Sequence, residues 1–322
     1  MQAIVGEEYG GPEVLELRDV DVPALHPDGV LVRVRASSVN PYDWHVMRGL
    51  PRLVRLSEGR SRPKQPIRGV DVAGVVEAVG ENVTAFRPGD EVFGAKAGAL
   101  AEYVCAGPKN VLAAKPAGLT FEQAAAIPLA GVTALQALRD KGRLEAGQRV
   151  LVNGAAGGVG TFAVQIAKAL GADVTGVCST RNVDLVTSIG ADRVLDYAEV
   201  DFARSDERYD LVLDNVGNRS LSDLRRALTP HGALVVVGGG GGNWIGPMML
   251  PLRAAMLSPF VGQRLLPFLA KHTQDDLLVL KELAETGKIV PVIDRTYPLA
   301  EAAEAIRYLE TGHARGKVVV AV

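Results

Sequence analysis

One stretch near the middle of the chain, residues 150–168, restricts the possible folds more than any other. It reads VLVNGAAGGVGTFAVQIAK, which is a short apolar run, a glycine-rich turn and then apolar residues at helical spacing. Gly157, Gly158 and Gly160 allow a tight turn and let the backbone approach a pyrophosphate, and the amides of the following helix favour negative charge. Any tight strand-to-helix turn uses glycine, but this order of strand, turn and helix predicts a dinucleotide-binding unit.

The residues after the next strand bear on the choice of dinucleotide. An NAD site usually has an acidic residue about 20 positions beyond the glycines, where it holds the ribose hydroxyls. Residues 174–183 contain no acid, and Ser179, Thr180 and Arg181 stand in the expected place. Hydroxyls and a guanidinium suit a 2′-phosphate, although a helix N-cap followed by a solvated Arg explains the same residues. The sequence favours NADPH over NADH.

Composition limits the class of protein. A chain of 322 residues exceeds the usual size of one domain, so two domains are expected. A net charge of -2 argues against a nucleic-acid binder. Cys105 and Cys178 are too few for a disulfide framework, and residues 1–8 lack a secretory pattern, so we expect a cytoplasmic protein.

The apolar segment 247–270 contains Met248, Met249 and Met256 but is interrupted by arginines and prolines. A membrane-spanning helix needs about 20 mostly apolar residues, so membrane insertion is not expected. We interpret the segment as a mobile one that lines a pocket or a subunit contact, and ordinary core packing is an equal alternative.

The pattern of elements changes near residue 120. Before it, short strand-like runs separated by Gly and Pro predict a compact, mostly β, barrel-like domain. After it, strands alternate with helices and predict an open parallel sheet. The expected strands are 14–20, 30–36, 70–79, 90–94 and 101–104, then 150–153, 174–178, 193–196, 211–214 and 233–238, and finally 317–322 after a helix at 299–309. The last strand is expected to return to the first domain.

Two loops follow strands of the predicted parallel sheet, at the edge where such sheets bind ligands. They are Asp214-Asn-Val-Gly217 and the glycine run 238–242. Both are candidates for the nicotinamide end of the cofactor, and simple flexibility is the alternative for the glycine run.

Further motifs extend over most of the chain. They are NPYD (40–43) with Arg48-Gly49, GVDVAGVVEAVG (69–80), PGDEVFG (88–94), AAAIPLAGVTA (124–134), AAGGVG (155–160) and Gly316-Lys317. With these motifs the chain resembles the zinc-independent members of the medium-chain dehydrogenase/reductase superfamily, in particular the quinone reductase branch.

The resemblance implies an α/β fold in two parts, often as a homodimer. It implies a GroES-like, mostly β catalytic domain (1–121 and 289–322) beside a Rossmann-type doubly wound domain (122–288) that binds NADPH. The implied cofactor contacts are Thr133, Ala156, Gly157, Gly158, Val159, Gly160, Ser179, Arg181, Tyr197, Asn215 and Gly238, with Lys317 as a weaker phosphate candidate.

The sequence predicts no metal site. Zinc-dependent relatives have a Cys where this chain has Asn40, and a Gly-His-Glu where it has Gly69-Val70-Asp71. The four-cysteine lobe of those relatives is missing, and none of the five His is paired at ligand spacing with another His or Cys.

Without a metal, hydride chemistry depends on the cofactor, and the protein supplies binding and orientation. A quinone needs little activation, whereas an enone benefits from a donor to its oxygen and a proton source. The candidates are Asn40 as hydrogen-bond donor, with Tyr42 and His45 as proton relays. A structural His that donates to the backbone is an equal alternative for His45. We expect an NADPH-dependent quinone reductase; an enone or alkenal reductase and a non-catalytic NADPH sensor are the alternatives.

Overall fold

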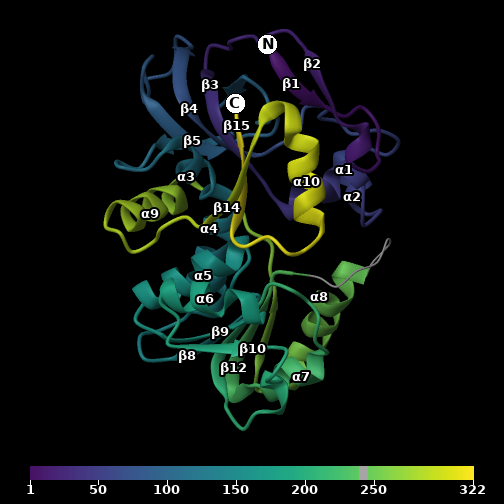
Figure 1. Cartoon of the computed structure of the whole chain (residues 1–322), viewed down its shortest axis with the longest axis vertical. Coiled ribbons are helices and arrows are strands. Elements are labelled where there is room, and N and C mark those ends of the chain that lie inside the picture. Colours follow the sequence, from purple (N-terminus) through teal and green to yellow (C-terminus); the bar gives the residue numbers. More distant parts are fainter. Residues whose placement is uncertain (239–245) are drawn as a thin grey trace. The chain divides into compact units, whose positions relative to one another are not determined.

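The computed structural model describes residues 1–238 and 246–322, which form two compact units (Figure 1). One unit comprises Met1–Val132 together with His272–Val322, and the other comprises Thr133–Lys271. The chain therefore leaves the first unit once and returns to it.

The first unit is built around a seven-stranded sheet in the order β14-β15-β3-β4-β5-β7, with β6 paired to β3. A separate two-stranded sheet pairs β1 with β2. The strands are β1 (Gln2–Val5), β2 (Glu16–Asp19), β3 (Val30–Val39), β4 (Asp71–Val79), β5 (Glu91–Ala95), β6 (Tyr103–Ala106), β7 (Val111–Ala114), β14 (Ile293–Pro298) and β15 (Lys317–Ala321). The helices are α1 (Pro41–Arg48), α2 (Val54–Glu58), α3 (Phe121–Ala125), α9 (Gln274–Glu285) and α10 (Ala302–Glu310).

The C-terminal strand completes this sheet. β15 runs antiparallel to β3 and parallel to β14, and Val318 lies opposite Val39. Helix α10 covers β14 and β15 and buries Ala302, Ala305 and Ile306 against them.

The boundaries of the units differ from those expected from the sequence, at 121/122 and 288/289. Helix α3 packs on β3 and β4, and α9 packs on β7, so both belong to the first unit. Helix α4 (Pro128–Gln136) runs across the boundary. The compact units therefore divide the chain about one helix away from each expected boundary.

The second unit holds a six-stranded parallel sheet in the order β10-β9-β8-β11-β12-β13. Numbered from β8, this is the order 3-2-1-4-5-6 of dinucleotide-binding sheets. The strands are β8 (Arg149–Asn153), β9 (Asp173–Cys178), β10 (Arg193–Asp196), β11 (Tyr209–Asp214), β12 (Leu228–Val236) and β13 (Arg264–Pro267). The predicted doubly wound sheet is confirmed.

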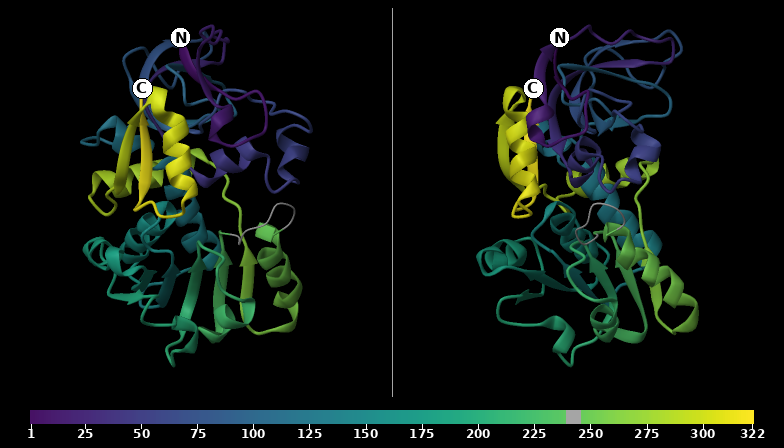
Figure 2. Two further views of the ribbon diagram at one scale, coloured as in Figure 1. Left: turned by 45° about the vertical axis from the view of Figure 1, so that its right-hand side comes forward. Right: turned by 90° about the vertical axis from the view of Figure 1, so that its right-hand side faces the viewer.

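Helices lie on both sides of these strands (Figure 2). They are α5 (Gly158–Ala169), α6 (Val183–Ser188), α7 (Leu221–Arg226) and α8 (Gly246–Leu257), and a π-helical turn, Ala137–Gly142, extends α4. Val150, Leu151 and Val152 are fully buried, as expected for a central strand with helices on both faces.

The segment 247–270 forms the last crossover of the parallel sheet. It contains most of α8 and all of β13, with Ala254 and Leu265 buried in the core, and the side chain of Met248 lies outside the described part. Leu252 and Met256 are exposed. Among the described residues, no helix has both the length and the apolar character needed to cross a bilayer.

The turn between β8 and α5 depends on Gly160 more than on Gly157. A Cβ on Gly160 would lie 2.0 Å from the carbonyl oxygen of Gly154, whereas a Cβ on Gly157 would meet that oxygen at 3.5 Å. Gly154 has a φ of 81°, which favours glycine, and it is not among the glycines predicted to shape the turn.

We expect Gly160→Ala to lower the free energy of unfolding by roughly 2 kcal/mol or more, because the backbone must move to admit the methyl group. Gly157→Ala is the matched control and should cost no more than about 1 kcal/mol. Urea denaturation of the two variants compares them directly. Equal losses would contradict this account of the turn.

Candidate functional site

The carboxyl edge of the parallel sheet has its topological switch point between β8 and β11. There the Asn153 amide donates to Asp214 Oδ1 at 2.8 Å, and the N–H groups of Val216 and Gly217 donate to the same oxygen. Burial raises the pKa of Asp214. These contacts fix the start of the loop 214–217, at the place where open α/β sheets bind ligands.

The glycine turn lies beside this point. Gly157 is the N-cap of α5, and the first helical bond runs from Thr161 N to Gly157 O. The amides of residues 158–160 therefore have no carbonyl acceptor within the helix and are available to an anion. Ala156 is almost fully buried, whereas Gly157, Gly158 and Val159 are partly exposed, as contact with a ligand requires.

Asn215 and Gly238 come together at the same edge. A Cβ on Gly238 would lie 2.1 Å from the Asn215 carbonyl oxygen, so the two loops are in close contact. Both polar atoms of the Asn215 amide, Nδ2 and Oδ1, are buried and have no hydrogen-bond partner. A buried amide without partners is costly, and a bound group with its own donor and acceptor would satisfy it. The rest of the predicted glycine run, 239–242, lies outside the described residues.

The residues predicted to read the ribose lie at the ends of β9 and β10. Arg181 and the Tyr197 ring are exposed, and Ser179 is partly exposed. Asp196, at the end of β10, lies opposite Cys178 in the strand register. Hydrogen bonds from the Thr180 hydroxyl and the Ala198 N–H hold the pKa of Asp196 below its usual range. The site thus contains an acid, Asp196, that was not predicted from the sequence, because it lies on β10 and not directly after β9.

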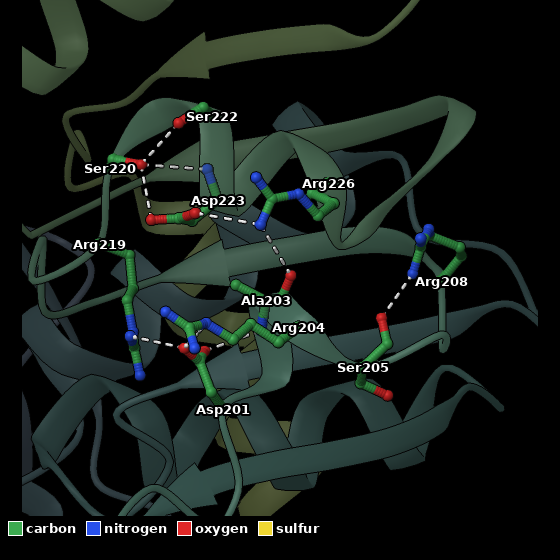
Figure 3. A network of polar contacts seen from close by, with 10 residues as sticks. All are labelled: Asp201, Ala203, Arg204, Ser205, Arg208, Arg219, Ser220, Ser222, Asp223 and Arg226. Atoms are coloured by element: carbon green, nitrogen blue, oxygen red, sulfur yellow. Dashed lines mark hydrogen bonds and ion pairs between the residues drawn. The ribbon is translucent and has the colours of Figure 1, made fainter.

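A network of polar contacts supports these loops (Figure 3). Asp201, in the loop after β10, accepts a hydrogen bond from Arg219, at the end of the loop after β11. Ser220 caps α7 by accepting the Asp223 N–H, and Asp223 pairs with Arg226. The network ties the loop that carries Asn215 to the loop that follows Tyr197.

Thr133 is buried at the start of the second unit, on α4. The structure therefore places nearly all of the predicted cofactor residues in one unit: Thr133, Ala156, Gly157, Gly158, Val159, Gly160, Ser179, Arg181, Tyr197, Asn215 and Gly238. Lys317 is the exception.

Lys317 belongs to a buried polar cluster of the first unit. β3 ends where β4 and β15 begin, because β3 is antiparallel to both. Lys317 Nζ donates to Asn40 Oδ1 and lies 3.3 Å from Asp71 Oδ2, and the Ser38 hydroxyl donates to that carboxylate oxygen at 2.7 Å. All four side chains are 3% exposed or less. Burial lowers the pKa of Lys317, and the Asp71 carboxylate opposes this effect.

These contacts disagree with two predicted roles. Asn40 Nδ2 has two hydrogens, and it donates to Asp71 Oδ2 at 2.9 Å and to the Ser38 carbonyl at 3.2 Å. Neither hydrogen is left for a substrate, so Asn40 positions the cluster. The ammonium of Lys317 is buried against Asn40 and Asp71, so it does not reach a cofactor phosphate in this structure.

Tyr42 and His45 lie on α1, directly after Asn40. The Tyr42 hydroxyl donates to Glu58 at 3.1 Å, and burial and Glu58 raise the pKa of Tyr42. His45 Nδ1 lies 2.8 Å from the Leu50 carbonyl oxygen, so this nitrogen carries the proton. Burial lowers the pKa of His45, and its ring stacks on Trp44. These contacts of His45 match the alternative in which it is a structural residue that donates to the backbone.

Asp43 is a buried acid of α1 that was not among the residues predicted from the sequence. It is 3% exposed, and its carboxylate accepts the Asn40 N–H at 2.7 Å. Burial raises the pKa of Asp43 to about 7; the hydrogen bond from Asn40 opposes this effect and the nearby Asp71 reinforces it.

In the part of the chain that the structure describes, no three His, Cys, Asp or Glu side chains are grouped to hold a metal ion.

Comparison with known proteins adds the following findings. Residues 26–117 match the family model "Alcohol dehydrogenase GroES-like domain", and residues 189–320 match "Zinc-binding dehydrogenase". The chain is 36% identical to the human quinone oxidoreductase over 99% of this chain and 97% of that protein. It is also 36% identical to the Arabidopsis thaliana NADPH-dependent alkenal/one oxidoreductase, over 99% of this chain and 79% of that protein. The solved structure of the Coxiella burnetii quinone oxidoreductase superposes with a TM-score of 0.87 at 32% identity, covering 100% and 99% of the two chains.

We expect the stability of the protein to fall as Asp43 ionises. Its folded pKa of about 7 lies above the unfolded value of 3.8, so the folded state binds the proton more tightly. The stabilisation is complete below about pH 4 and is lost as the pH rises through about 7, a change on the order of 4 kcal/mol at most.

Asp43→Asn removes this titration and keeps an acceptor for the Asn40 N–H. Urea denaturation at acid and at mildly alkaline pH should show wild type losing stability relative to Asp43→Asn. The exposed Asp19 supplies the control, Asp19→Asn. A difference between wild type and Asp43→Asn that is independent of pH would contradict the assignment.

Proposed function

This chain belongs to the medium-chain dehydrogenase/reductase superfamily of NAD(P)H-dependent oxidoreductases, and we propose that it reduces quinones with NADPH and without a metal ion. A Rossmann-type sheet and a GroES-like domain form its two parts.

The single observation that carries the cofactor assignment is the buried, unpartnered amide of Asn215. It lies at the carboxyl edge of the parallel sheet, beside a helix N-terminus that can accept a pyrophosphate. The residues therefore fit a nicotinamide dinucleotide, which supplies a hydride when bound. Asn215 would pair with a carboxamide through one donor and one acceptor, the amides of residues 158–160 would hold phosphate, and Arg181 with Ser179 would hold the 2′-phosphate.

The polar cluster of the first unit supports a metal-free reaction. At the positions where zinc-dependent relatives have a Cys and a Gly-His-Glu, the side chains of Asn40 and Asp71 are already bonded to Lys317. The ammonium of Lys317 already supplies a positive charge next to Asp71. It would repel a second cation such as a metal ion.

The relatives favour a quinone acceptor and name a second candidate. The human relative and the Coxiella burnetii structure are quinone oxidoreductases, and the Arabidopsis thaliana relative acts on alkenals and enones. Asn40 has no free donor, so little in this cluster would activate an enone oxygen. Of the two acceptors, a quinone depends less on such a donor, since aromatisation of the product drives its reduction.

The first test is oxidation of NADPH by the purified, chelator-treated protein with 1,4-benzoquinone as acceptor. We expect rapid turnover that added zinc does not increase. NADPH binding without quinone turnover would reject the quinone assignment. In that case, turnover with an enone would identify an enone reductase. Turnover with neither acceptor would identify a non-catalytic NADPH sensor.

Substitution of Arg181 tests the choice of cofactor. We expect Arg181→Ala to raise the Michaelis constant for NADPH about tenfold and to leave that for NADH unchanged, because charge-assisted bonds to the 2′-phosphate are lost. Arg149→Ala, at the amino end of β8, is the control. If both constants change equally, Arg181 does not read the phosphate, and Asp196→Asn then tests whether Asp196 reads the ribose of NADH.

We also propose that the protein is a cytoplasmic homodimer. Its two cysteines, Cys105 and Cys178, are both free thiols, which suits a reducing compartment. The quinone reductase branch that the chain resembles supports the dimer. Light scattering of the purified protein and fractionation of cells test the two statements separately.

A further inference from the structure

A small pocket of about 40 Å³ lies entirely within the first unit. Its walls include Tyr42, Asp43 and Glu58, the apolar Ile67 and Val46, and the guanidinium-bearing Arg68. This volume is sufficient for a water molecule or for the oxygen end of a larger molecule.

Arg68 is the unusual member of this wall. Its side chain is 4% exposed, and Nη2 donates to the Gly6 carbonyl at 2.7 Å. Nη1 makes a long contact of 3.4 Å to the Gln65 carbonyl, and Nε is buried without a partner. A guanidinium has five N–H donors, so most of them are unused here. A buried donor without a partner costs free energy unless a ligand satisfies it.

The backbone holds Arg68 in a fixed position. Its N–H donates to the Ile4 carbonyl at 3.1 Å, and its carbonyl accepts the Leu100 N–H at 2.8 Å. The preceding residue, Ile67, forms a bridge with Val5. The guanidinium is therefore presented from rigid structure, as a binding group should be.

The surrounding charges restrict the chemistry of a ligand. Asp43, Glu58, Tyr9 and Tyr42 all lie close enough to interact electrostatically with Arg68. A ligand with a permanent negative charge would meet two carboxyl groups as well as the guanidinium. A neutral carbonyl oxygen avoids that repulsion and still accepts a hydrogen bond.

We propose that Arg68 donates a hydrogen bond to the carbonyl oxygen of the electron-poor acceptor, seated with that oxygen in this pocket. The inference rests on the proposed reductase function and supplies the donor that Asn40 does not. The acceptor gains a hydride at the ring carbon conjugated with that carbonyl, so a C–H bond forms, the C=C pair shifts toward the carbonyl carbon and the π pair of the C=O bond moves to the oxygen. That oxygen becomes an anion and takes a proton from water. Loss of a proton from the new CH2 carbon to solvent and gain of one by the second oxygen then give the hydroquinone. The bond from Arg68 strengthens as this charge develops.

Kinetics of three variants test the role of Arg68 with 1,4-benzoquinone. Arg68→Met should lower kcat/KM about 10- to 100-fold, and Arg68→Lys, which keeps the charge, should lose less. NADPH affinity, measured by fluorescence, should not change. Arg87→Met, at an exposed position of the same unit, is the matched control, and thermal unfolding verifies that each variant is folded. Wild-type kinetics in a folded Arg68→Met would overturn the inference.

A binding experiment is independent of turnover. 4-(Dimethylamino)cinnamaldehyde is neutral, and its absorption shifts to longer wavelength when its carbonyl oxygen accepts a hydrogen bond. Without NADPH, wild type should produce this shift in the bound aldehyde, and Arg68→Met should abolish it. No shift in wild type would overturn the inference even if Arg68→Met failed to fold.

The two experiments distinguish the proposals. A shift that depends on Arg68 in a protein without quinone turnover would reject the function and retain the oxygen site. Quinone turnover that is unaffected by Arg68→Met would reject the oxygen site and retain the function.

Discussion

The first unit depends on the buried ammonium of Lys317. It joins the ends of three neighbouring strands, because Asn40 follows β3, Asp71 begins β4 and Lys317 begins β15. Removing an ammonium and a carboxylate from water costs several kcal/mol per ion, so the cluster is stable only when each group is hydrogen-bonded. The Ser38 hydroxyl and the Leu129 N–H complete the bonding of the carboxylate. The same contacts fix the start of α1, and with it Tyr42 and Asp43.

The second unit has a site of a different kind. It is made mostly of backbone, small residues and one amide that the folded chain leaves unpaired. Its precision comes from the sheet, since Asn153 and Asp214 join β8 to β11 at the switch point. The polar network from Asp201 to Arg226 then holds the loops that follow β10 and β11. Such a site needs few specific side chains. A glycine motif is therefore enough to predict it from the sequence.

The sequence predicted the features that local order determines. The strand, turn and helix around Gly160 are contiguous, so their spacing alone specifies the parallel unit. Contacts between distant residues could not be found in this way, and Lys317 was assigned to a phosphate because its partners lie on other strands. Arg68 belongs to the segment 48–68, which contains seven basic residues and one acid, and arginines in such a segment are ordinarily solvated. Its burial follows from the pairing of residues 67 and 68 with the first strand and with Leu100, which only the fold reveals.

The charges of the first unit also explain why Arg68, and not Lys317, is the group that we propose as donor to the acceptor. Where a zinc ion would polarise a substrate through an open coordination position, the ammonium of Lys317 is directed toward Asn40 and Asp71. It neutralises charge but cannot reach a substrate oxygen. When the acceptor becomes an anion, a donor to its oxygen must then lie elsewhere, in a group that is cationic, rigidly held and has an N–H donor without a partner. Among the side chains that line the pocket, the guanidinium of Arg68 meets these requirements.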